Sequence, residues 1–190
     1  MIKHTIKLNL RYPKTPLMSD NTYIIILRLL HIGFGIFWAG SVFLTVLFVI
    51  PSLKATGPDG AKFMQSLNKK GYPIAMMIAA IITIVSGFLL IWKLSGGFDP
   101  VWFKSWYARI LTSGATMALI AFIIGIAVNR PAATKMNRIG ESIAKQGTGP
   151  TPEQMNEMMA LRKKIFTATN YIAVLLFVAV AAMSIFRYLG

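Results

Sequence analysis

The chain has 190 residues, of which 55% are apolar and only 14% are charged. This composition is typical of a protein that crosses a membrane several times, and it excludes an ordinary soluble domain. The net charge of +14 would suggest nucleic-acid binding in a soluble protein, but here the basic residues flank long apolar runs, where they can meet anionic lipid head groups. We therefore expect a lipid bilayer as the partner, and no nucleic acid. The chain has no cysteine, which excludes disulfides, thiolate metal sites and thiol catalysis within it.

The chain begins with a polar segment and a long apolar run. Residues 1–22 are polar and basic, and we interpret them as an N-terminal tail that precedes a single membrane domain, 23–190. The run 23–50 can cross a bilayer once, since a crossing needs about 20 apolar residues. Pro51 follows this run, and because proline cannot continue a helix without losing a hydrogen bond, we expect the first helix to end there.

Three further apolar runs can each cross the bilayer, at about 72–92, 106–128 and 165–188. Before the last of them, the segment 129–164 reads as a polar loop followed by an amphipathic helix. Thr151 followed by Pro152 is a typical helix start, and the pattern predicts that this helix continues into the fourth span without a break. The apolar runs are continuous and do not alternate, which excludes a β-barrel. The sequence thus predicts an all-α integral membrane protein, an up-down bundle of four transmembrane helices.

The first run contains two ionisable residues, Arg28 and His31. Such residues are costly at membrane depth and usually mark a site. They are three apart, so they share a helix face, and Gly35 and Trp38 follow on the same face. This order could hold a haem, with a propionate near Arg28, the iron on His31 and the ring over Gly35. Two alternatives stay open for the histidine: a packing residue bonded to a neighbouring hydroxyl, or a proton relay.

A haem bound through one histidine needs a second ligand or an open position. Depth along the helices makes Met117 and Met183 the possible second ligands, and Arg109 could pair with a second propionate. Each also has an interpretation without haem, because a methionine can pack against other helices or lipid and an arginine can extend to the lipid head groups. On the second run, Ser86 and Gly87 are small enough to let another helix or a ring approach closely.

Other chemistry finds little support in the sequence. No span contains Asp or Glu, which disfavours a self-contained pump or cation transporter. The metalloprotease, nucleophile-elbow and Walker motifs are all missing, so the sequence points to no particular enzymatic reaction. Three methionines could form a cluster that holds Cu(I), or they could be an amphipathic stripe on the membrane: Met155, Met158 and Met159.

The segment LRLLHIGFGIFWAG, residues 27–40, resembles the first span of bacterial four-helix membrane proteins of the copper-resistance D type and of HemJ-type protoporphyrinogen oxidases. The runs GPDGAKFMQ and LRKKIFTATN resemble less characterised bacterial relatives of that group. The resemblance implies a haem b held by the first-span histidine, His31, and a place in the bacterial inner (cytoplasmic) membrane. HemJ-type enzymes also rely on a lysine beside the haem, and no lysine lies inside a span here.

These observations lead to three expectations of function. The first is a haem-b protein that transfers electrons, to or from a quinone or a porphyrin. The others are a non-catalytic accessory subunit of a larger membrane complex or homo-oligomer, and a copper-handling protein. The loops 51–71 and 129–164 carry more Lys and Arg than the opposite ends of the spans, so the positive-inside rule predicts that both loops are cytoplasmic.

Overall fold

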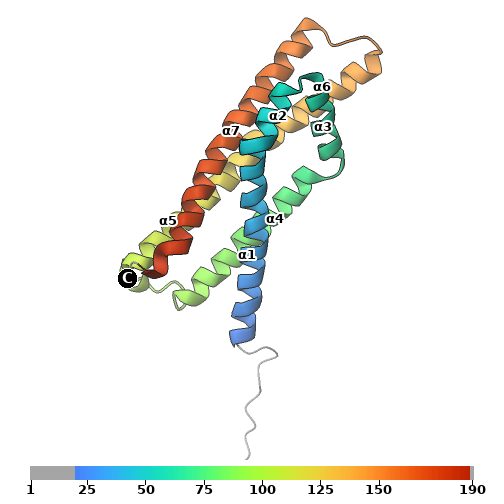
Figure 1. Ribbon diagram of the computed structural model, residues 1–190. Coiled ribbons are helices and arrows are strands. Elements are labelled where there is room, and N and C mark those ends of the chain that lie inside the picture. The colour runs from blue at the N-terminus through green and yellow to red at the C-terminus, as the bar shows by residue number, and fades with distance from the viewer. Residues whose placement is uncertain (1–19, 189–190) are drawn as a thin grey trace, which may run out of the picture.

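The computed structural model describes residues 20–188, apart from the side chains of Asp20, Pro58, Asp59, Ala61 and Arg187. All regular elements in this range are helical, which confirms the all-α prediction. Four helices in the described part of the chain are long and apolar enough to cross a membrane, and successive spans run in opposite directions (Figure 1). The protein is therefore a multi-pass, up-down four-helix membrane protein. Most of the predicted tail, 1–22, lies outside the described residues, and its last three residues already belong to the first helix.

The first span is α1 (Asp20–Leu44), and helical structure continues beyond the proline that we expected to end it. A five-residue π-helix, η1 (Thr45–Val49), leads directly into α2 (Ile50–Ala55), which contains Pro51. The expectation that the helix stops at Pro51 is therefore wrong. A proline ring clashes with the carbonyl of the preceding turn, and the wider π turn just before it makes room for the ring.

A short outer helix, α3 (Pro58–Lys69), connects this segment to the second span, α4 (Tyr72–Leu94). The turn between them depends on Gly71, whose φ is +84°. This left-handed conformation suits glycine because it has no Cβ to clash with the neighbouring carbonyl. The chain thus changes direction at Gly71, and α4 returns through the membrane packed against α1 (Figure 1).

The third span begins after a short 3₁₀ turn, η2 (Trp102–Lys104), and comprises α5 (Trp106–Ile124). It too continues through a π-helix, η3 (Gly125–Asn129), into α6 (Arg130–Gln146), and again a proline, Pro131, follows the π turn. The first part of the segment that we expected to be a polar loop is therefore helical and continuous with the third span.

The fourth span is the end of one long helix, α7 (Pro152–Ile185), which has 34 residues. The Thr151 hydroxyl accepts a hydrogen bond from the Gln154 backbone, and the Gln154 side chain accepts one from the Thr151 backbone, so both halves of a capping box are present. The helix runs into the span without a break, as the sequence predicts. It is about 50 Å long, against about 30 Å for a hydrocarbon core, so its first turns project from the membrane.

The four spans form two antiparallel pairs. α1 packs most extensively on α4, and α5 on α7. The pairs meet at a buried cluster in which small side chains allow close helix contact: Trp38, Ala39, Val42, Ala79, Ala80, Ala121, Ile172, Ala173 and Leu176. Toward its own start, α1 diverges from α5 and α7 (Figure 1). His31 lies in this diverging half of α1.

Candidate functional site

His31 lies in the contact between α1 and α4, and its ring is half-buried. The ring Nδ1 is 2.8 Å from the backbone carbonyl oxygen of Thr83. A carbonyl oxygen only accepts hydrogen bonds, so Nδ1 must carry the proton, and in the neutral ring Nε2 then holds the lone pair. The structure therefore sets both the orientation and the tautomer of this imidazole.

The histidine ring fills the space left by a missing side chain on α4. A Cβ added to Gly87 would lie 2.7 Å from Cε1 of His31 and 2.9 Å from its Nδ1. Both distances are too short for real atoms, so the ring can occupy this position only because residue 87 is glycine. This agrees with the expectation that the small residues at 86 and 87 admit a close neighbour.

The hydroxyls beside the ring bond to their own helix. Thr83 Oγ1 donates to the carbonyl of Ala79 at 2.8 Å, and Ser86 Oγ donates to that of Ile82 at 2.5 Å. Ser86 Oγ also lies 3.2 Å from the Thr83 carbonyl, the oxygen that His31 contacts. The partner of His31 is thus a backbone carbonyl and not the hydroxyl that the packing alternative expected.

The next two residues of the predicted haem face, Gly35 and Trp38, are engaged in helix packing. A Cβ on Gly35 would lie 3.4 Å from the Thr83 methyl group, so α4 already lies over that glycine. Trp38 is 6% exposed and meets the ring of Phe122 edge-on, with centroids 6.5 Å apart. Arg28, by contrast, is exposed on the outside of α1. A haem on this face could therefore use His31 and Arg28, whereas the surface at Gly35 is covered.

The remaining predicted residues belong to the other helix pair. Arg109 is exposed, and its guanidinium lies 5.9 Å from the centre of the Trp106 ring. Met183 packs between α7 and α5, because a Cβ on Gly114 would come 3.4 Å from its Cγ. Met117 is half-buried on α5. The structure thus brings His31 and Gly35 together against α4, and it places these three residues in the α5–α7 pair.

Among the side chains that the structure describes, no group of three or more metal-binding His, Asp or Glu residues occurs. This finding does not bear on haem binding, because haem iron needs only one or two axial ligands from the protein. The methionine cluster considered for copper lies at the projecting start of α7, where Met155 and Met159 are exposed and Met158 is half-buried. These methionines therefore lie outside the helix pair that contains His31.

Two polar contacts at the π-helices were missed by sequence reasoning. At η1, Thr45 Oγ1 lies 3.0 Å from the hydroxyl of Tyr72 and donates to the carbonyl of Ser41 at 2.8 Å. At η3, Asn129 Nδ2 donates to the hydroxyl of Thr169 at 3.1 Å. Each contact ties a π turn to the returning helix of its pair. The proline that follows each of the two apolar runs, Pro51 and Pro131, could have indicated the π turns, but their partners depend on distant parts of the chain.

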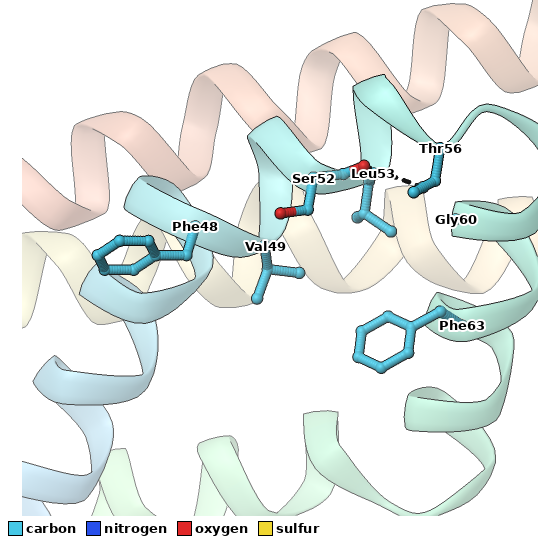
Figure 2. A pocket seen from close by; sticks show the side chains of 7 residues that line it. All are labelled: Phe48, Val49, Ser52, Leu53, Thr56, Gly60 and Phe63. Atoms are coloured by element: carbon cyan, nitrogen blue, oxygen red, sulfur yellow. Dashed lines mark hydrogen bonds between the residues drawn. The ribbon is translucent and has the colours of Figure 1, made fainter.

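A separate hollow of about 390 Å³ lies where η1 and α2 face the start of α3. It is lined by Phe48, Val49, Ser52, Leu53, Thr56, Gly60 and Phe63. Figure 2 shows the side chains of Val49, Leu53 and Phe63 around one apolar space, and the Thr56 hydroxyl donates to the carbonyl of Ser52. No lining residue is ionisable, so the hollow can contact an apolar group but offers no acid, base or charge for catalysis.

No protein-family model, curated protein or solved structure matches the chain.

Proposed function

We propose that the protein binds a haem b through Nε2 of His31 and takes part in electron transfer in the membrane. The observation that supports this proposal is the hydrogen bond from Nδ1 to the Thr83 carbonyl. Histidines that bind metals almost always donate their other ring N–H to a carbonyl, carboxylate or water, which fixes the tautomer and makes the ligand nitrogen more basic. His31 has this arrangement in a membrane-spanning helix.

Arg28 supports the same proposal. It lies one turn before His31 on the same side of α1 and is exposed, so its guanidinium is available to a propionate. A bound haem would supply one-electron redox chemistry, with a quinone or a porphyrin as the proposed electron partner. The resemblance of residues 27–40 to copper-resistance D and HemJ-type proteins points the same way. A second ligand from Met117 or Met183 stays a prediction, as does a role for Arg109.

A second candidate is a non-catalytic subunit that packs against a larger membrane complex. One observation favours it: the His31 ring fits into the space over Gly87 and bonds to Thr83, which accounts for the histidine by helix packing alone. In that case the imidazole joins α1 to α4 and needs no cofactor.

The visible spectrum of the detergent-purified protein, after haem has been supplied, separates the two candidates. The haem proposal expects a Soret band that is lost in His31→Ala and kept in Gly33→Ala, a change in the same helix where an added Cβ meets no atom within 4 Å. Arg28→Gln should weaken haem binding without abolishing the band, because it removes a propionate contact and leaves the ligand in place. A wild-type protein without a Soret band would refute the haem proposal and leave the packing function.

A further inference from the structure

A cleft between α6 and α7 shares no lining residue with the surroundings of His31 and has a volume of about 880 Å³. It begins at Ile126, in the π turn that follows the third span, and continues along α6 past Arg130 and Arg138. The cleft thus starts at the apolar end of a transmembrane helix and leads out of the membrane among basic residues. Its position and lining do not depend on whether His31 binds haem.

The polar lining of α6 follows a helical repeat. Arg130, Thr134, Arg138 and Ser142 all line the cleft, and each is four residues from the next. Residues at this spacing lie above one another on one helix face. Arg130 and Arg138 are about 12 Å apart along the axis, and both side chains are long enough to reach toward a group between them.

The charges of the cleft favour an anion. Its one acidic lining residue, Glu157, is already ion-paired with Lys135. In the part of the chain that the structure describes, no carboxylate pairs with Arg130 or Arg138. Two guanidinium groups thus remain available, and their forked donors match the oxygens of a phosphate.

The neighbouring hydroxyl and amide do not compete with the arginines. The hydroxyl of Thr134 donates to the Arg130 carbonyl at 3.0 Å, and the side-chain amide of Gln154 donates to Gln146 at 3.4 Å. The donors that remain for a ligand on this face are therefore the two guanidinium groups and the neutral hydroxyl of Ser142. Since only the guanidinium groups are charged, a negative charge is the property that the cleft would select.

The apolar end of the cleft indicates which anion it would take. Ile126 and the ring of Pro131 line this end on either side of Arg130 in the sequence, and Ile139 lines the cleft farther out, next to Arg138, so hydrocarbon and cationic surface are continuous along it. A free anion would leave the apolar part unused, whereas an anionic lipid at the membrane surface uses both. We infer that this cleft binds an anionic glycerophospholipid, with its phosphate at Arg130 and Arg138 and its acyl chains toward Ile126. Basic pockets between helices at the membrane surface are suited to such head groups.

The test uses the full chain in a neutral detergent, with native mass spectrometry to count bound lipid. Phosphatidylglycerol and phosphatidylcholine serve as matched anionic and zwitterionic probes, and inorganic phosphate serves as the free anion. The variant R130Q/R138Q removes both cleft guanidinium groups, which are exposed and have no ion pair among the described residues. K163Q/K164Q is the control, because it removes two exposed cations from the projecting part of α7 that do not line the cleft.

We expect tight binding of one phosphatidylglycerol, preferred over phosphatidylcholine. R130Q/R138Q should bind it about 30-fold more weakly, at about 1 kcal/mol for each cation near the surface, and the control should stay within about threefold of wild type. Equal binding of the two lipids, or equal losses in both variants, would overturn the inference. Inorganic phosphate that displaces the lipid at equal concentration would also overturn it, because the acyl chains would then contribute nothing.

Discussion

Gly87→Ala is the sharpest test of the contact between α1 and α4. The added Cβ would lie 2.7 Å from Cε1 of His31, whereas ordinary contacts begin at 3.4 Å. The ring must therefore move by about 0.7 Å. A movement of that size along the bond would stretch the 2.8 Å separation from the Thr83 carbonyl to about 3.5 Å, beyond the range of N–H···O hydrogen bonds.

The energetic cost follows from this displacement. Losing a polar contact between transmembrane helices costs about 0.6–1.7 kcal/mol, and the remaining crowding adds about 1 kcal/mol, the low end for overpacking. Replacing glycine by alanine inside a helix stabilises the helix by about 0.5–1 kcal/mol. Gly33→Ala should gain this helix stability without any crowding, since nothing lies within 4 Å of the added Cβ. Gly87→Ala should therefore be about 2 kcal/mol less stable than Gly33→Ala.

The assay is unfolding by sodium dodecyl sulfate in mixed micelles, followed by helical circular dichroism. A double-mutant cycle then isolates the contact: once His31→Ala has removed the ring, Gly87→Ala should lose most of its cost. If Gly87→Ala is as stable as Gly33→Ala, the ring does not occupy the space over residue 87. If its cost is unchanged in the His31→Ala background, the crowding comes from something other than the imidazole.

Three further predictions concern two helix contacts and one helix cap, and are measured by the same unfolding assay. Gly114→Ala places a Cβ 3.0 Å from a side-chain carbon and 3.1 Å from a backbone oxygen of α7, so it should cost about 1–3 kcal/mol; Gly140→Ala, with open space around its Cβ, should not destabilise. Thr151→Ala removes the capping box and should cost about 1 kcal/mol, with Thr151→Ser as the variant that restores it. Asn129→Leu loses one hydrogen bond to α7 but also removes a buried carbonyl oxygen that has no partner among the described residues. Its free energy of unfolding should therefore stay close to that of the wild type. A destabilisation of about 2 kcal/mol or more would mean that the oxygen does have a hydrogen-bond partner.

The number and course of the spans could be predicted because they follow from hydrophobicity and local capping. An apolar run of about 20 residues has few alternatives to a membrane helix, and the pairing of Thr151 with Gln154 is a local signal that does not depend on the rest of the fold. The continuity of α7 into the membrane follows from the same local pattern. These features needed no knowledge of which helix lies beside which.

The surroundings of His31 could be predicted only in part. The sequence places Arg28, His31, Gly35 and Trp38 on one side of α1, but it does not say what lies opposite. The structure places Thr83 over Gly35 and buries Trp38 in the four-helix core. Since the choice of partner helix depends on contacts between distant parts of the chain, a face that looks like a cofactor surface in one helix can be a packing surface in the bundle.

The two π-helices link the membrane part of the chain to the outer part. In both helix pairs, a span ends in five π residues and continues into a further helix, α2 or α6, whose second residue is a proline, although the side chains of the two segments differ. A π turn holds about one more residue than an α turn, so everything beyond it is rotated by about 100° relative to an uninterrupted helix. The face of α6 that carries Arg130 and Arg138 is therefore set by η3. An uninterrupted α-helix from Trp106 would direct this stripe away from the cleft that it lines beside α7.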